Sequence, residues 1–342
     1  SNANLAYVDL TNQDLSGTNL EGATLSHSKL KTNSLNNKDL SNANLAYVDL
    51  TNQDLSGTDL SETFLFRTNL SNKDLREISI ENADFRYANL SYGILPDSIL
   101  IDNKFEYAVL SNIDFSGRDL SNSIFIQAEF TNSIFNNVVF QNTYLNGIDF
   151  TKIKNKSLET AKIERSSISF SDLREVKLPN EIFHTNFYNT KMNEVDFSGK
   201  KIIGSLFEKT LMKNANMQNA DFHAVAKTIT IKDAFELTPI ELKNEISPFP
   251  LVQITNIIPA GNDVVVEYLL YNNFVNTDLN NANMQNGKFF FADFSNADLS
   301  NSDLSNSDLS NAYLVKTNLN NANLEGANLE GANLDGANLD GA

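Results

Sequence analysis

Large apolar residues recur at every fifth position over roughly the first 150 residues of this chain. The series runs from Leu5 to Phe150 in leucine or phenylalanine, and Ile80 is its one β-branched member. An α-helix would place apolar residues 3.6 apart and a strand would alternate them. A period of five keeps these side chains inside only if the backbone turns a corner in every repeat. Four corners close a square, so the pattern predicts stacked coils of twenty residues each.

The positions between the large residues fit this square coil. A small residue stands two positions before most leucines, Asn or Asp lies between, and pairs such as Ser-Asn, Glu-Gly or Asp-Gly follow as turn residues. The chain here resembles the pentapeptide-repeat family, whose motif is A-[DN]-L-x-x. The stretch from Ala327 to Gly341 matches that motif at every position. The resemblance covers roughly four-fifths of the chain and implies an all-β fold, a right-handed quadrilateral parallel β-helix.

A duplication supports the twenty-residue coil. Residues 1–18 recur unchanged at 41–58, a shift of two whole coils. Such a shift preserves every vertical column, in which residue n lies on residue n+20. The first three residues either remain from a cleaved tag or belong to the repeat, since 41–43 have the same sequence.

Changes of register divide the chain into four parts. We predict regular coils over 1–150, degenerate coils over 151–222, a non-repeating insertion over 223–273, and regular coils again over 274–342. In the degenerate part, the series that ends at Phe183 restarts at Phe187, which indicates a one-residue deletion near His184. At about 4.8 Å per coil, roughly fourteen coils would stack to ~70 Å.

The insertion has the composition of a small α+β segment. Thr238-Pro239-Ile240-Glu241 is a capping box, which predicts a short helix ending near Ile246. The β-rich runs 252–258 and 264–271 flank a Pro- and Gly-containing turn and predict a hairpin. We expect the insertion to loop out of the stack, with the coils continuing from Phe274. It either packs on the coils or provides a loop that recognises a partner.

Catalytic and metal-binding patterns are missing from the sequence. The chain has no cysteine, and its three histidines lack the spacing of a metal site. It has no phosphate-binding glycine loop and no nucleophile motif. We therefore expect no enzymatic activity, no cofactor and no metal.

The net charge of −17 is unevenly distributed. Residues 1–150 contain 19 acidic and 9 basic side chains, whereas 151–274 contain 15 of each. Residues 275–342 contain 9 acidic and 2 basic ones. Such a surface repels nucleic acid and anionic membranes, so a protein is the expected partner.

Two sets of outward positions are candidate partner-binding residues. The aspartates fall into columns on two adjacent faces: Asp14, Asp54, Asp74 and Asp114 on one, and Asp39, Asp59 and Asp119 on the next. Apolar residues occupy outward positions in the middle of the repeats: Ile94, Ile99, Ile124, Ile134, Val139 and Tyr144. Either other parts of the chain or a partner should cover them, because clustered exposed apolar residues mark contacts.

Long polar residues replace the small inward residue at several repeats. Examples are Lys38, Lys73 and Arg118, each followed by an aspartate. An unpaired cation cannot enter a narrow apolar coil. We therefore expect the backbone to bulge at these sites and to turn the cation outward beside its aspartate.

Three functions are compatible with these features. The first is a protein-interaction scaffold without catalysis. The second follows from the resemblance: some pentapeptide-repeat proteins mimic DNA and act on DNA gyrase or topoisomerase IV. Duplex DNA carries one charge per ~1.7 Å, however, so ~70 Å of duplex would hold roughly 40 negative charges, whereas the net charge of this chain is −17. The third is a fragment of a secreted or injected effector. The chain has no signal peptide and no transmembrane run, which favours a cytoplasmic location.

The C-terminal end consists of regular repeats without an aromatic plug, helix or proline. Solenoids need terminal caps, so we expect either a truncated chain or an end-to-end homodimer. Glu325, Glu330, Asp335 and Asp340 fall one per face on the last coil. Their mutual repulsion favours truncation over dimerisation.

Overall fold

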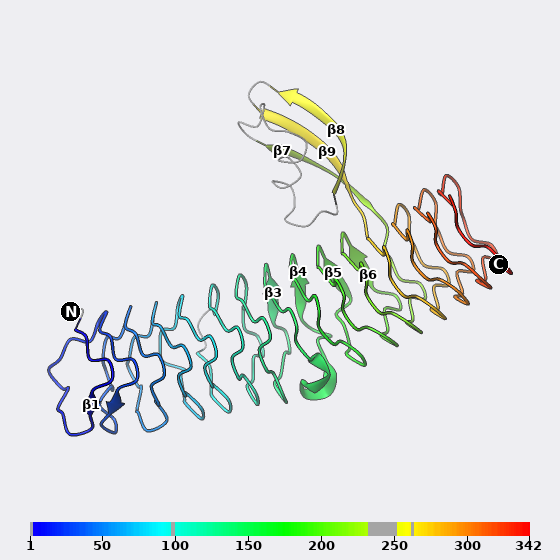
Figure 1. The fold of residues 1–342 in the computed structure, drawn as a ribbon. Helices are drawn as coiled ribbons and strands as arrows, with labels where there is room; N and C mark the ends of the chain where they lie inside the picture. Colours follow the sequence, from blue (N-terminus) through cyan, green and yellow to red (C-terminus); the bar gives the residue numbers. More distant parts are fainter. Residues whose placement is uncertain (1–2, 97–99, 232–251, 261–262) are drawn as a thin grey trace. The chain divides into compact units, whose positions relative to one another are not determined.

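The chain folds into four-sided coils stacked in parallel, and the computed structural model describes residues 3–96, 100–231, 252–260 and 263–342 (Figure 1). It forms two compact units, Ser1–Lys162 and Ile163–Ala342. In the first unit, a continuous ladder of parallel bridges links Asn4, Thr24, Asn44 and Phe64 and extends at the same spacing to Tyr144. The fold is the right-handed quadrilateral β-helix that the sequence predicted.

The regular strands on the coils are very short. In the first unit they are β1 (Asp9–Leu10), β2 (Lys29–Leu30) and β3 (Val139–Gln141). β4 spans Lys162–Glu164, β5 Glu181–Phe183 and β6 Lys201–Ile203. The inward residues Ile163, Ile182 and Ile202 lie over one another in β4, β5 and β6.

The corners explain why Asp or Asn precedes each inward leucine. The side chain of Asp39 accepts hydrogen bonds from Ser41 N at 3.0 Å and from Ser41 Oγ at 2.6 Å, which holds the following turn. The second residue after the leucine adopts a positive φ, for example +59° at Asn42. Asn and Gly tolerate this left-handed backbone best, which accounts for their frequency there.

The core consists of columns of inward side chains. Phe85, Phe105 and Phe125 are fully buried, with ring centroids 5.1 and 4.9 Å apart and nearly parallel planes. The predicted stacking of residues n and n+20 is therefore confirmed for this block.

The register changes have local causes. Two 3-10 helices, η1 (Phe150–Lys152) and η2 (Lys154–Lys156), lengthen one coil, and Asn155 within η2 has φ +59°. Bridges between Ser167 and Asn186 span 19 residues instead of 20, so a later coil is one residue short. The predicted one-residue deletion is therefore present, and it lies between Leu178 and Ile182, which are both fully buried, a few residues before His184. The prediction that Phe183 points inward is therefore wrong, and its side chain is half-buried at the surface.

The insertion forms a three-stranded antiparallel sheet that stands off the coils of the second unit (Figure 1). Its order is β7 (Val225–Ile231), β9 (Asp263–Leu270) and β8 (Val252–Ala260). β8 and β9 pair as the predicted hairpin, whereas β7 was not predicted. The predicted helix near Ile240 lies outside the described residues.

The coils resume directly on the coil where they stopped. The ring of Phe274 stacks on that of Phe207 at 4.9 Å, and Leu206 bridges to Asn273. Asn272, which is fully buried, holds this junction. Its Nδ2 donates to the carbonyls of Ile202 at 2.8 Å and Phe222 at 2.7 Å, and its Oδ1 accepts from Ser205 N at 2.9 Å.

The long polar residues do not cause bulges, and that prediction is wrong. Lys73 N donates to Leu70 O as at the other corners, and Asp74 keeps its bridge to Ile94. The Nζ of Lys73 donates to the carbonyl of Gln53 in the preceding coil at 2.6 Å. Lys38 likewise donates to Ser16 O at 2.6 Å. A backbone carbonyl can thus satisfy the ammonium group, so the coil need not open.

Candidate functional site

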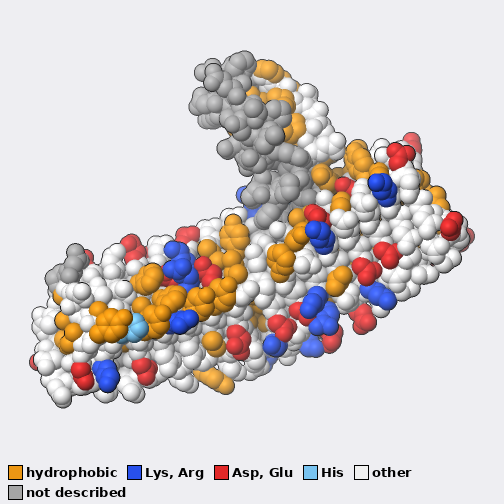
Figure 2. Space-filling view, viewed as in Figure 1, with side chains coloured by type: hydrophobic (Ala, Val, Ile, Leu, Met, Phe, Trp, Pro, Cys, Tyr) orange, Lys and Arg blue, Asp and Glu red, His pale blue; other side chains and the backbone are white. Residues whose placement is uncertain are grey.

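An exposed column of aromatic rings runs along one corner of the first unit. Tyr7 stacks on His27 with centroids 4.5 Å apart, and His27 stacks on Tyr47 at 4.2 Å. Further along, Tyr87 and Tyr107 are 4.6 Å apart and nearly parallel. The four tyrosines are between 41% and 76% exposed. A stripe of hydrophobic side chains, with histidine and cationic side chains beside it, is visible along this unit in Figure 2.

An arginine completes the column where the corner has no ring. The guanidinium carbon of Arg67 lies 5.7 Å from the ring centroid of Tyr47 and 5.2 Å from that of Tyr87. Phe66 contacts both tyrosines in edge-to-face geometry, at 5.6 and 5.3 Å. Tyr7, His27, Tyr47, Phe66, Arg67, Tyr87 and Tyr107 are called the corner column below.

A second arginine extends this surface sideways. Arg86 lies 5.8 Å from the centroid of Phe64, which is 40% exposed, and its Nη2 is 2.6 Å from Asp84 Oδ2. The ion pair with Asp84 raises the pKa of Arg86, and burial opposes that shift. The corner column and these neighbours form a surface rich in aromatic and arginine side chains.

The corner residues of the column adopt a backbone conformation that does not favour them. The φ values of Tyr7, His27, Tyr47, Arg67, Tyr87 and Tyr107 lie between +55° and +62°. The same corner conformation is taken by asparagine or glycine at most described corners of the second unit, for example at Asn296, Asn301 and Asn306. A bulky residue there costs about 1 kcal/mol or more, and such strain is concentrated at functional sites.

The predicted acidic residues lie in columns, but other residues interrupt them. Asp39 bridges to Asp59 on the next coil, whereas Asp74 bridges to Ile94 and Asp114 to Ile134. Asp119 bridges to Val139. Asp14 and Asp54 each hold a corner by accepting a hydrogen bond from the N–H two residues on, at 2.9 and 3.0 Å.

Hydrogen bonds lower the pKa of several of these carboxylates. The pKa of Asp39 is lowered mainly by the hydrogen bond from Ser41 Oγ and then by the one from Ser41 N. The pKa of Asp54 is lowered mainly by the hydrogen bond from Ser56 Oγ. The pKa of Asp14 is lowered first by the bond from Ser16 N. Hydrogen bonds from Arg76 lower the pKa of Asp74 to about 2.

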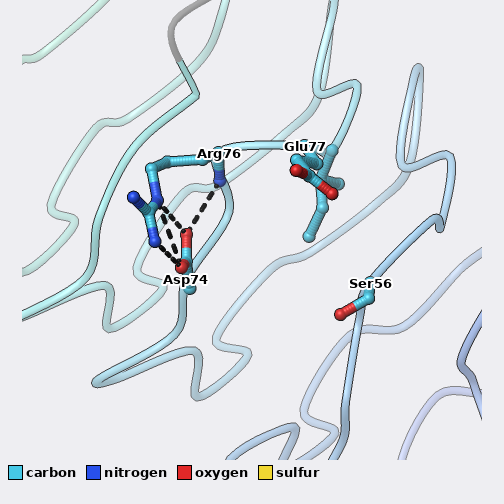
Figure 3. Close-up of a pocket in the computed structure, with 5 residues that line it drawn as sticks. Ser56, Asp74, Arg76 and Glu77 are labelled. Carbon is cyan, nitrogen blue, oxygen red and sulfur yellow. Dashed lines mark hydrogen bonds and ion pairs between the residues drawn. The ribbon is translucent and has the colours of Figure 1, made fainter.

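A shallow pocket of about 360 Å³ lies beside Asp74 (Figure 3). The guanidinium of Arg76 turns back onto Asp74, with Nη2 2.6 Å from Oδ2, while Ser56 and Glu77 line the other side (Figure 3). Arg76 compensates the charge that Asp74 would contribute to an acidic face.

The predicted apolar positions differ in exposure. Ile94 is 47% and Tyr144 is 49% exposed, so the described parts of the chain leave both side chains largely uncovered. Ile124, Ile134 and Val139 are half-buried. Ile124 bridges to Tyr144, and both belong to the face that also includes Phe64. Ile99 lies outside the described residues.

The histidines have separate environments. His27 belongs to the corner column, His223 hydrogen-bonds to Asp221, and His184 lies at a corner of the second unit. Within the described ranges, no group of three or more histidine, aspartate and glutamate side chains could hold a metal ion. Across the same residues, no helix has the length and apolar character needed to cross a membrane.

Comparisons with known proteins agree with this architecture. Eight copies of the family model for pentapeptide repeats match residues 1–31, 34–72, 74–117, 119–151 and 307–342. The search of curated proteins found no match.

Several solved structures are similar to the chain. HetL, a pentapeptide repeat protein involved in heterocyst differentiation regulation in the cyanobacterium Nostoc sp. strain PCC 7120, is 19% identical over 88% of this chain and 86% of its own, with a TM-score of 0.27. QnrB1, a plasmid-mediated fluoroquinolone resistance protein, is 16% identical over 71% of this chain and 87% of its own, with a TM-score of 0.32.

Proposed function

Because the chain belongs to the pentapeptide repeat family, we propose that it is a non-enzymatic scaffold that binds a protein through the corner column. The observation that carries this proposal is the stack of bulky, exposed side chains in left-handed backbone positions. Asparagine would be less strained at each of these corners. The fold alone therefore gives no reason for tyrosine at Tyr7, Tyr47, Tyr87 and Tyr107.

The residue types suit a protein interface. Tyrosine and arginine are enriched among the residues that contribute most binding energy, and tyrosine loses little conformational entropy on binding. Here the rings already stack on one another, so their conformations are largely fixed before a partner arrives. Five coil spacings separate Tyr7 from Tyr107, which at about 4.8 Å each gives a surface ~24 Å long.

The expected partner presents basic and apolar side chains. The ring faces within the column are covered by neighbouring rings or by the Arg67 guanidinium, so a partner would meet ring edges and tyrosine hydroxyls. Asp9 and Asp49 each follow a tyrosine of the column by two residues and are exposed. Residues 1–150 carry a net charge of −10, which favours a basic protein segment over nucleic acid or an anionic membrane.

DNA mimicry is the alternative and has weaker support. Asp39 and Asp59 on adjacent coils favour it, since hydrogen bonds keep the pKa of Asp39 low. Ile94 and Ile134 interrupt the other acidic column, and Arg76 pairs with Asp74. A surface that imitates phosphate spacing would need a more continuous series of unpaired carboxylates.

Site-specific photo-crosslinking in the source cell tests the proposal. A photoreactive phenylalanine replaces Tyr87 in the corner column, Asn122 at an exposed corner as the control, or Asp59 in the acidic column. We expect one protein to be captured from position 87 and not from position 122. Capture of a type II topoisomerase from position 59 alone would favour DNA mimicry. The absence of any product specific to position 87 would contradict the proposal.

A further inference from the structure

A cleft of about 420 Å³ lies where the insertion leaves the coils of the second unit. The coil side is formed by the ends of β4, β5 and β6, including Arg165, Phe183 and Lys201. The insertion side is formed by β7 and β9, including Lys227 and Tyr268. Its volume falls within the usual range for small-molecule sites.

Cationic side chains outnumber acidic ones in the described lining of the cleft. Among the described residues, Arg165, Lys201 and Lys227 line it together with one acid, Glu164. Arg165 Nε lies 4.0 Å from Glu164 Oε1, the limit of an ion pair, and the Nζ of Lys201 lies 6.0 Å from the Phe183 ring. In a protein with a net charge of −17, this local excess of positive charge is unusual. It favours an anionic ligand.

The wall beneath these cations is apolar. Ile203 and Leu270 are buried and pack together, with Phe183, Val225 and Tyr268 partly buried against them. The short coil points Ile182 inward, so the side chain of Phe183 lies at the surface and forms part of this wall. The cleft therefore combines an apolar surface with cations.

His184 lies within the cleft and can report on its occupancy. Burial lowers the pKa of His184, and the charges of Arg165 and Lys227 lower it further, while Glu164 opposes them. Lys201 and Tyr268 also line the cleft, and burial raises the pKa of Tyr268. A bound anion would offset the field of Arg165 and Lys227 and so raise the pKa of His184.

We propose that this cleft binds a small organic anion, a phosphate monoester or carboxylate attached to one apolar group. Arg165 lines it from the coil and Lys227 from the insertion, and these two side chains would hold the anionic end. The apolar group would lie on Phe183, Ile203 and Leu270. The ligand needs both an anionic end and an apolar group, because neither the cations nor the apolar wall of the cleft alone would enclose it.

Imidazole NMR of the whole chain tests this proposal with phenyl phosphate as the probe. The sequence has only three histidines, so His27 and His223 serve as internal controls. We expect a saturable shift of the His184 signals at millimolar phenyl phosphate and a rise in its pKa. Benzoate should also shift His184, since it shares the charge and the ring. Benzyl alcohol and inorganic phosphate should each bind at least about tenfold more weakly.

Matched variants separate the cleft from general charge effects. Arg165→Gln with Lys227→Gln should weaken phenyl phosphate binding at least about tenfold. Lys213→Gln with Lys316→Gln removes the same charge from exposed positions elsewhere in the unit and should leave binding unchanged. All four replaced side chains are exposed, so both double variants should melt at the same temperature as the unchanged chain.

Three results would overturn the proposal. One is the absence of a His184 shift, and another is an equal shift with inorganic phosphate or benzyl alcohol. The third is unchanged binding by the Arg165→Gln, Lys227→Gln variant.

Discussion

Replacing Phe105 with alanine should lower the free energy of unfolding by about 3–5 kcal/mol. The ring is fully buried between Phe85 and Phe125, at 5.1 and 4.9 Å. Its removal leaves a cavity that the neighbouring coils can fill only by breaking their own stacking. Because each coil of a solenoid contacts only its neighbours, the loss should be local. Amide hydrogen exchange of Leu90, Phe125 and their neighbours measures it.

Lys104→Ala is the matched control for this prediction. Lys104 is exposed on the same coil, so the substitution should change the free energy by less than about 0.5 kcal/mol. A loss below about 1 kcal/mol for Phe105→Ala would contradict the account of the core as tightly packed columns.

Replacing Asn272 with alanine should cost about 3 kcal/mol or more. At other corners, the N–H three residues after the inward side chain donates to that residue's carbonyl, as Ala23 N does to Leu20 O. In the turn after Ile202, the side-chain amide of Asn272 lies between these two groups. It donates to Ile202 O and accepts from Ser205 N, and it also donates to Phe222 O. The alanine variant leaves three buried backbone groups without their partner, each worth about 1–3 kcal/mol. Urea denaturation followed by circular dichroism measures the loss.

Asn328→Ala provides the comparison. Asn328 is exposed and makes similar bonds, to Asp308 Oδ1 at 3.3 Å and from Glu330 N at 3.1 Å. Water can replace those bonds, so the expected loss is below about 1 kcal/mol. Similar losses for the two variants would mean that Asn272 does not hold the junction between the interrupted coils.

The coil could be predicted from the sequence because its determinants are local. One side of the square is specified by an inward Leu or Phe, a small residue two positions earlier and a pair of turn residues. Each of the four sides repeats this pattern. The Phe85–Phe105–Phe125 column follows from the count of twenty. The antiparallel pair β8 and β9 also followed from two β-rich runs.

The errors arose where a side chain's partner lies on another coil. Lys73 was expected to turn outward because its bond to Gln53 O, twenty residues away, is not visible in the motif. The five-residue count placed Phe183 inward after Leu178, whereas in the short coil Ile182 is the buried residue. β7 alternates Ile and Thr at its end but was not predicted, because its partner β9 follows more than thirty residues later.

The corner column was missed because corners were treated only as turns. Tyr7, Tyr47, Tyr87 and Tyr107 are separated by multiples of twenty, and His27 belongs to the same series. Comparison of each corner residue along a column, and not only along the chain, would have found the stack. The outward Asp and apolar residues were predicted to bind a partner, although Asp at that position mainly holds the turn.

The central claim is that the corner column binds a protein, and substitution of its tyrosines by asparagine tests it most directly. The double variant Tyr47→Asn, Tyr87→Asn removes two rings and relieves the strain of a bulky residue in the left-handed backbone conformation. The loss of ring stacking lowers the free energy of unfolding and the relief of strain raises it, so the two effects should nearly cancel. Binding of the partner captured at position 87 is then measured by calorimetry for this variant and the natural chain. We expect at least about tenfold weaker binding with a free energy of unfolding changed by less than about 1 kcal/mol. Undiminished binding by the folded variant would contradict the claim.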